Sequence, residues 1–119
     1  MGMFSWLPFG KVPEVSPAQL HAMVSDSTTR TQVIDVRLGA EWRAGRVPGA
    51  INIPVTQLGE RIGELNLDPA RPIIAICRSA HRSIPAVRTL RKHGFANACQ
   101  LQGGMLAWWK ANLPLEGAK

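Results

Sequence analysis

The chain has 119 residues, of which 45% are hydrophobic and 18% are charged, a composition typical of one globular domain and not of a disordered segment. Its 14 Lys and Arg against 8 Asp and Glu give a formal net charge of +6, which favours an anionic partner. The basic residues are scattered and do not alternate with aromatic side chains, so we expect a small anionic substrate rather than a nucleic acid.

Residues 1–14 form an apolar N-terminal arm, which begins MGMFSWLPFG and precedes a domain that we place at residues 15–119. The arm lacks the basic start and long apolar run of a signal peptide, and it is shorter than the roughly 20 apolar residues that cross a bilayer. Trp6 also stands where a myristoylation signal has Ser or Thr. We therefore expect the arm to fold onto the domain, with a contact to a membrane or a partner as the minor alternative.

The chain contains two cysteines, Cys77 and Cys99, which form neither a C-x-x-C pair nor a zinc-ligand set nor a disulfide framework. Free thiols of this kind suit a reducing compartment, so we expect a cytoplasmic protein. We expect no metal and no other cofactor. The sequence does not predict an oligomeric state.

The first predicted helix starts at Ser16, whose side chain is placed to cap it, with Pro17 in the first turn and Gln19 completing a capping box. The run QVIDV at 32–36 is rich in β-branched residues and predicts a short strand. The following patterns predict a short helix at 40–45, a turn and strand at 47–54, and a helix with one apolar face at 55–65.

The run PIIAIC at 72–77 is apolar without alternation, which is typical of a strand buried on both faces of a parallel sheet. The pattern is completed by a helix at 83–94, a strand at 95–101 and a helix at 103–112. Gly94 stands where a glycine ends a helix, and of the adjacent Trp108 and Trp109 we expect one in the core and one near the surface. This alternation predicts an α/β fold with a mostly parallel central sheet flanked by helices on both faces.

The stretch CRSAHRS at 77–83 places Cys77 at the carboxyl end of the most buried strand, where ligands collect in open α/β sheets. A sharp turn before the next helix would aim backbone N–H groups at the sulfur, as in an anion-binding nest, and Arg78 and Arg82 add positive charge. These features favour the thiolate and predict a nucleophilic cysteine. Cys99 has no basic neighbour in its strand and is expected to be structural.

Four segments, in this order, carry a resemblance to a known family: IDVRLGAEWRAGRVPGAINIP at 34–54, CRSAHRS at 77–83, GF at 94–95 and LQGGMLAW at 101–108. With these segments the chain resembles a single-domain rhodanese, a thiosulfate sulfurtransferase, from about Val15 to Pro114. The resemblance implies the rhodanese-like α/β fold and a ping-pong reaction through a cysteine persulfide.

In that reaction Cys77 would take the outer sulfur of thiosulfate, release sulfite and pass the sulfur to cyanide or to a thiol acceptor. The resemblance assigns the substrate-binding loop to Arg78, Ser79, Ala80, His81 and Arg82. Within the loop Arg82 is expected to brace the backbone, while Arg78 or His81 contacts the substrate oxyanion. His81 as a solvated residue at the rim is an equal alternative.

Polar residues outside the loop receive supporting roles. Asp35 resembles an aspartate that anchors the loop from behind, and Ser83, which follows the loop directly, is expected to lie there too. Arg37 and Glu41 are four residues apart and are expected to form a local salt bridge.

Two positions depart from the family pattern: Arg46 stands where the family usually has His, and Ala80 stands where it usually has Gly. Arg46 precedes its strand and is expected to lie away from the site. A positive φ at Ala80 would strain the loop by roughly 1 kcal/mol or more, because its Cβ crowds the backbone there.

The length of the loop separates the reaction classes that share this architecture. The related phosphatases and arsenate reductases carry C-x5-R, a wider loop, whereas four residues (78–81) separate Cys77 from Arg82 here, as in sulfurtransferases. A phosphatase or arsenate reductase is therefore the weaker alternative. A rhodanese-like module for sulfur relay or protein binding, with little turnover of thiosulfate, stays open, as do the physiological sulfur donor and acceptor.

Overall fold

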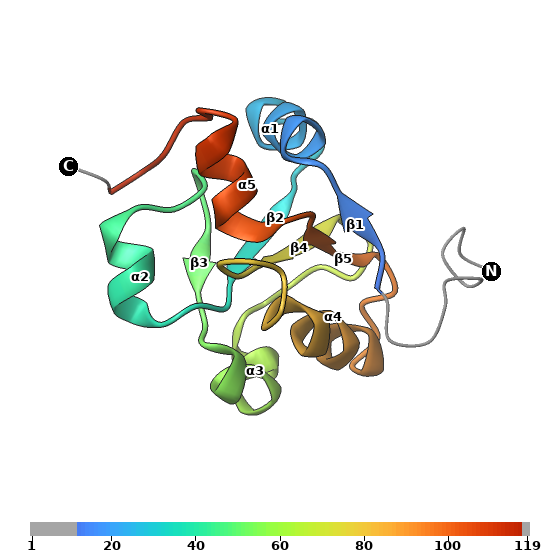
Figure 1. Cartoon of the computed structure of the whole chain (residues 1–119). Coiled ribbons are helices and arrows are strands. Elements are labelled where there is room, and N and C mark those ends of the chain that lie inside the picture. Colours follow the sequence, from blue (N-terminus) through green and yellow to red (C-terminus); the bar gives the residue numbers. More distant parts are fainter. Residues whose placement is uncertain (1–11, 118–119) are drawn as a thin grey trace.

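The computed structural model describes residues 12–117, in which a five-stranded sheet carries helices on both faces (Figure 1). All strand pairs are parallel, in the order β1-β5-β4-β2-β3. The strands are β1 (Glu14–Val15), β2 (Gln32–Asp35), β3 (Ile51–Asn52), β4 (Ile73–Ile76) and β5 (Ala98–Leu101). The predicted fold class is confirmed.

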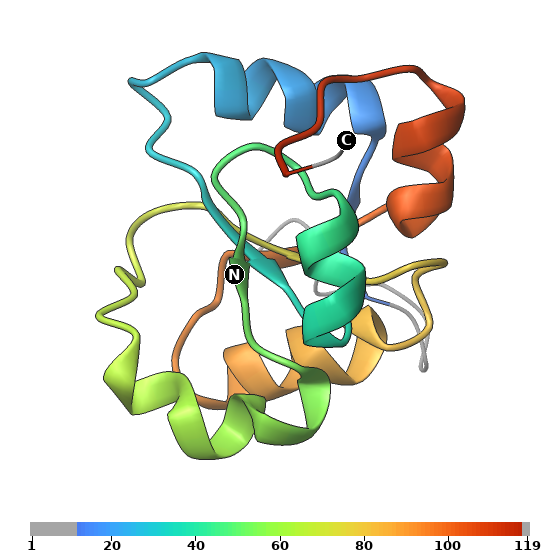
Figure 2. The ribbon, with the colours of Figure 1, turned by 90° about the vertical axis from the view of Figure 1, so that its left-hand side faces the viewer.

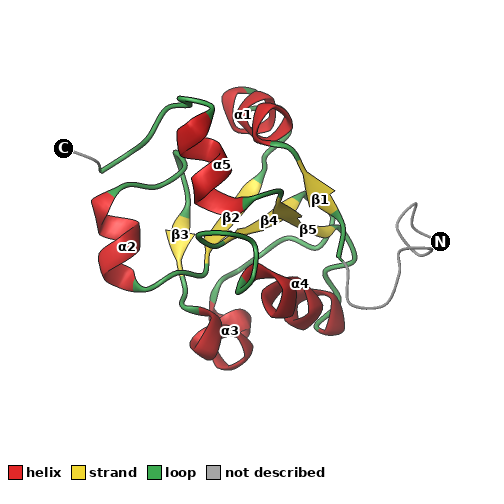
Figure 3. Cartoon of the chain, in the orientation of Figure 1, coloured by secondary structure: helices red, strands yellow, loops and turns green. Residues whose placement is uncertain are grey.

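The helices divide between the two faces of this sheet. They are α1 (Pro17–Ser25), α2 (Gly39–Ala44), α3 (Val55–Arg61) with the 3-10 turn η1 (Ile62–Glu64), α4 (Ser83–Lys92) and α5 (Gly104–Lys110). Helices α1 and α5 cover one face, and α3 and α4 cover the other (Figure 3). Figure 2 shows the same two layers from the side, with α2 next to the edge strand β3. None of the helices in residues 12–117 is both long and apolar enough to span a bilayer.

Strand β4 lies between β2 and β5, and all four of its residues are buried. Ile73 and Ala75 belong to the core under α3 and α4, whereas Ile74 and Ile76 belong to the core under α1 and α5. Burying one Ile side chain contributes roughly 2 kcal/mol, so this strand is anchored on both faces. The unbroken apolar run therefore marks the central strand, as predicted, and the residue after it has a fixed position.

Local signals at the ends of the helices are confirmed. Ser16 Oγ accepts from the backbone N–H of Gln19 at 3.1 Å, and Gln19 Oε1 accepts from the Ser16 N–H at 2.8 Å, which is the predicted capping box. Gly94 has φ 97° after the end of α4. Trp108 is fully buried and donates from Nε1 to the Pro114 carbonyl, whereas Trp109 keeps 38% of its surface exposed.

The sheet begins earlier than the sequence suggests. Glu14 and Val15 form the edge strand β1 beside β5, and Val12 is buried in the core, so the fold includes residues from the end of the segment interpreted as an arm. A two-residue strand shows no alternation, which is why no sequence pattern revealed it. The apolar start of the arm, including Trp6, lies outside the described residues.

Candidate active site

Cys77 follows β4 directly, and its side chain is 1% exposed in the core under α3 and α4. The loop of residues 78–82 then leads into α4, which begins at Ser83. This position at the carboxyl end of a central parallel strand is the one expected for a reactive group in an open α/β sheet.

Helix α5 holds the start of the loop from the opposite face of the sheet. Its backbone N–H groups at Met105 and Leu106 donate to the carbonyls of Cys77 and Arg78, at 2.8 and 2.9 Å. Gly104 makes this approach possible, because a Cβ at that position would lie 2.5 Å from the Cys77 carbonyl oxygen and its φ is 61°. The backbone carbonyls of Cys77 and Arg78 are thereby satisfied and fixed.

The sulfur does not have the partners that the sequence led us to expect. In residues 12–117 no loop N–H donates to Cys77 Sγ; its hydrogen-bond partner is the hydroxyl of Ser83, at 3.4 Å. The Cys77 side chain is buried in the core that also contains Ala86 and Val87 of α4. Ser83 is 0% exposed at the start of α4, directly after the loop.

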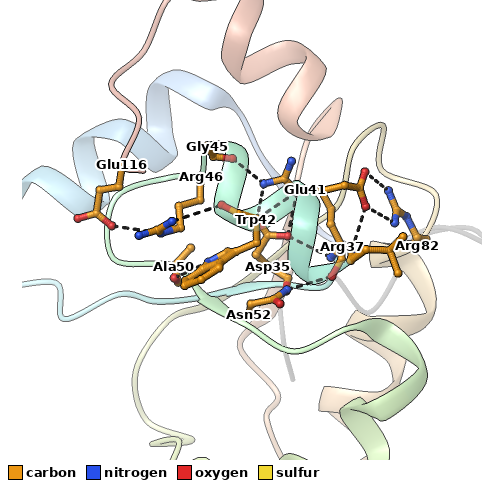
Figure 4. A network of polar contacts seen from close by, with 11 residues as sticks. Asp35, Arg37, Glu41, Trp42, Gly45, Arg46, Ala50, Asn52, Arg82 and Glu116 are labelled. Atoms are coloured by element: carbon orange, nitrogen blue, oxygen red, sulfur yellow. Dashed lines mark hydrogen bonds and ion pairs between the residues drawn. The ribbon is translucent and has the colours of Figure 1, made fainter. Parts of the chain in front are cut away.

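The predicted salt bridge between Arg37 and Glu41 is wrong. Glu41 instead pairs with Arg82 of the loop, with oxygen–nitrogen distances of 2.9 and 3.2 Å (Figure 4). The spacing of four residues brings side chains together only within one helix, and Arg37 precedes the start of α2. The ion pair therefore links the loop to α2, and Arg82 braces the loop through a residue that sequence reasoning assigned elsewhere.

Asp35 and Arg37 form a buried pair at the end of β2 (Figure 4). The Asp35 carboxylate accepts from Arg37 Nη2 at 2.7 Å, from Nε and from the Arg37 backbone N–H. Arg37 Nη2 also donates to the Gly45 carbonyl, and Asn52 Nδ2 donates to the carbonyls of Asp35 and Arg37. Asp35 thus fixes the segment around α2, and within residues 12–117 the hydrogen bonds of its carboxylate all go to Arg37.

A cleft of about 320 Å³ lies beside the loop, between α2 and α5. It is lined by Arg37, Glu41, Ala44, Gly45, Arg78 and Trp109. Arg37 is neutralised by Asp35, whereas Arg78 is exposed and forms no ion pair with the described residues. Among the described residues the cleft therefore has one unpaired positive charge, from Arg78 directly after Cys77, and an aromatic wall from Trp109.

The remaining loop residues form its outer rim. Ser79 Oγ lies 2.8 Å from His81 Nδ1, and His81 is exposed. Ala80 has φ 73°, the positive value at which an alanine is strained. Arg46 lies outside the cleft, as expected: its guanidinium stacks on Trp42 at 3.9 Å, and its Nε is 3.8 Å from Glu116 near the end of the chain.

Cys99 lies on the other face of the sheet from Cys77. It is buried in the core under α1 and α5, and burial raises the pKa of its thiol, with a smaller opposing effect from Arg91. A raised pKa leaves less of the Cys99 thiol in its reactive thiolate form near neutral pH, which agrees with the structural role expected from the sequence.

Sequence reasoning missed three residues that shape this site: Glu41, Trp109 and Gln100. Gln100 is 3% exposed and accepts from Ser83 Oγ at 2.6 Å. Gln100 could have been found in the sequence as a polar residue inside an otherwise apolar strand, because a buried amide needs hydrogen-bond partners.

The first prediction concerns Ala80. Replacing it with Gly removes the strain of the positive φ, and the greater freedom of glycine in the unfolded chain offsets part of that gain. We expect Ala80→Gly to raise the free energy of unfolding by up to about 1 kcal/mol in urea denaturation. Ala22→Gly, at an exposed position inside α1, should lower it by about 1 kcal/mol; a similar loss from both changes would contradict the strain at Ala80.

The second prediction concerns the ion pair between Glu41 and Arg82. The hydrogen bonds from Arg82 lower the pKa of Glu41 from 4.5 to about 2, against an opposing effect of burial. Because the pKa of Glu41 is lower in the folded protein than in the unfolded chain, the ion pair stabilises the fold above pH 4.5. This stabilisation is lost as the pH falls toward 2. Partly exposed pairs contribute at most about 1 kcal/mol.

Glu41→Gln should therefore lower the free energy of unfolding by a constant amount above pH 4.5, and the difference from the natural protein should shrink toward pH 2. Urea denaturation at a series of pH values measures it. Glu64→Gln is the matched control, because Glu64 is 69% exposed and 3.9 Å from Arg61, and it should have little effect. A difference for Glu41→Gln that persists unchanged at the acid end would show that the charge of Glu41 is not what matters.

Comparison with known proteins adds independent information. The family model described as Rhodanese-like domain matches residues 16–111. An HTH-type transcriptional regulator from Mycobacterium tuberculosis is 45% identical over 72% of this chain, and the match spans only 38% of the regulator. A sulfurtransferase from Allochromatium vinosum is 31% identical over 87% of this chain and 94% of its own length. The thiosulfate sulfurtransferase GlpE from Shewanella oneidensis is 33% identical over 68% of this chain and 78% of its own length.

Among solved structures, a rhodanese-related protein from Thermoplasma volcanium superposes with a TM-score of 0.77 at 27% sequence identity. The superposition covers 88% of this chain and 98% of that protein. The match therefore extends over nearly the whole fold that positions Cys77 and its loop.

Proposed function

Because this chain belongs to the family of rhodanese-like domains, we propose that it is a thiosulfate sulfurtransferase that carries the transferred sulfur on Cys77. Sulfurtransferases are named among its relatives, and a sulfur donor and a sulfur acceptor are the partners that such an enzyme requires. The observation that carries the proposal is the position of Cys77, at the carboxyl end of β4 and directly before the loop with Arg78 and Arg82.

In the first half-reaction the Cys77 sulfur, as thiolate, attacks the outer sulfur of thiosulfate. The new bond is the S–S bond of a persulfide, and the bond to the sulfonate sulfur breaks, so that sulfite leaves with the electron pair. Arg78 is exposed and beside Cys77, and it stabilises the negative charge of the donor. Arg82 is already paired with Glu41, so its role is to hold the loop.

In the second half-reaction cyanide or a thiol attacks the outer sulfur, and the electron pair of the S–S bond returns to Cys77 as thiolate. Neither half-reaction needs an external oxidant, since the sulfur arrives in the oxidation state in which it leaves. The outer sulfur of the persulfide lies about 2.0 Å beyond Sγ. We propose that the N–H groups of the loop, none of which donates to Sγ among the described residues, stabilise the charge on that outer sulfur.

The third prediction tests this assignment by measuring thiocyanate formed from thiosulfate and cyanide. Cys77→Ser should abolish the activity, because the serine hydroxyl cannot carry a sulfane sulfur, and thermal unfolding should remain near that of the natural protein. Cys99→Ser should retain most of the activity, because Cys99 lies on the opposite face of the sheet.

Equal loss in both variants would contradict the role of Cys77 as the single sulfur carrier. If the natural protein forms no thiocyanate from thiosulfate but takes up sulfur from a persulfide donor, it is a sulfur-relay module and the proposed donor is wrong. Hydrolysis of an aryl phosphate in the same preparation would overturn the assignment to sulfur transfer.

A further inference from the structure

A chain of polar side chains runs from the reactive thiol through the core to the edge of the sheet. Cys77 Sγ lies 3.4 Å from Ser83 Oγ, which lies 2.6 Å from Gln100 Oε1. Gln100 Nε2 in turn lies 2.8 Å from Glu14 Oε2. Ser83 and Gln100 are buried, at 0% and 3% exposure, whereas Glu14 is exposed on β1.

The register of the sheet brings these side chains together. Glu14 of β1 is the direct partner of Gln100 of β5, so their side chains leave the same face. Ala98, two residues before Gln100, lies in the core under α3 and α4, and the alternation of a strand places Gln100 on that face as well. Ser83 starts α4 on the same face, within reach of both Gln100 and Cys77.

The direction of each hydrogen bond follows from the end of the chain. A carboxylate can only accept, so the Gln100 amide must turn its NH₂ group toward Glu14 and its oxygen toward Ser83. That oxygen can only accept, so Ser83 donates its single hydroxyl proton to Gln100, in a short bond of 2.6 Å. Ser83 Oγ then has no proton left for the sulfur, and it can only accept one from Cys77.

We propose that Glu14 and Gln100 are positioning residues that orient the Ser83 hydroxyl so that it stabilises the thiol of Cys77 and not the thiolate. For Ser83 to donate to a thiolate, it would have to leave Gln100 with a buried, unpaired oxygen. The contact keeps the unloaded cysteine, which carries no transferred sulfur, in its less reactive thiol form until a sulfur donor binds. It is also specific to the unloaded state, because the Sγ of a persulfide bears a sulfur in place of the proton.

This inference rests on the proposed function only in taking Cys77 as the reacting residue. Its test is the alkylation rate of Cys77 by iodoacetamide at near-neutral pH, followed by peptide mass spectrometry that separates Cys77 from Cys99. Alkylation requires the thiolate but no sulfur donor or acceptor, so its outcome is independent of the sulfurtransferase assay.

Gln100→Met keeps the length of the side chain and removes the acceptor. The Ser83 hydroxyl is then free to donate to the sulfur, and we expect Cys77 to be alkylated roughly tenfold faster. Glu14→Gln should act in the same direction but less strongly, because Gln at position 14 no longer forces the Gln100 amide into one orientation. Gln102→Met, an exposed position just after β5, is the matched control and should leave the rate unchanged.

A double-mutant cycle separates orientation from loosened packing. In a Ser83→Ala background, Gln100→Met and Glu14→Gln should no longer change the rate, since the hydroxyl that they release is absent. If the acceleration persists without Ser83, it comes from improved access or from the lost charge of Glu14, and the proposal is overturned. An unchanged alkylation rate in both single variants also overturns the proposal. Because Glu14 is exposed, Glu14→Gln tests the proposal even if Gln100→Met does not fold.

Discussion

Helix α5 begins against the carbonyl groups of Cys77 and Arg78, and this contact sets the shape of the site. A chain that leaves a fully buried strand must turn without exposing its backbone polar groups to the core. Two N–H groups at the start of α5 meet that requirement, which is possible only because Gly104 brings the backbones together. On its far side the loop is tied to α2 by the ion pair between Arg82 and Glu41. Cys77 therefore lies between two fixed points, and its side chain packs in the core under α3 and α4.

The distribution of charge around Cys77 is more selective than the net charge of the chain suggests. Arg82 is neutralised by Glu41, and Arg37 is neutralised by Asp35. Arg78 remains as an exposed cation on the cleft that is bounded by Glu41 and Trp109. The paired arginines hold the loop and the segment around α2, and the unpaired Arg78 is available to an anion. The sulfur of Cys77 has Ser83 as its hydrogen-bond partner within the described residues, and the Ser83 hydroxyl already donates its proton to Gln100.

Much of this architecture could be predicted from local patterns. The unbroken apolar run before Cys77 defines β4, and the capping box at Ser16 defines the start of α1, because both depend on residues close in sequence. The adjacent Trp108 and Trp109 predicted one buried and one exposed ring, and the structure has Trp109 as the exposed one. The sequence also indicated that a positive φ at Ala80 would strain the loop, and the structure has φ 73° there. The interactions that were missed join distant parts of the chain. Arg82 and Glu41 are 41 residues apart, and Gln100 and Glu14 are 86 apart, so no spacing rule indicates either pair.

Intact-protein mass spectrometry after treatment with thiosulfate shows whether Cys77, and not Cys99, carries the sulfur, as we propose. We predict that the natural protein gains the mass of one sulfur atom, that peptide mapping places it on Cys77, and that cyanide removes it with formation of thiocyanate. A protein whose Cys77 reacts with an alkylating reagent but never gains that sulfur, or whose sulfur is found on Cys99, would contradict the claim.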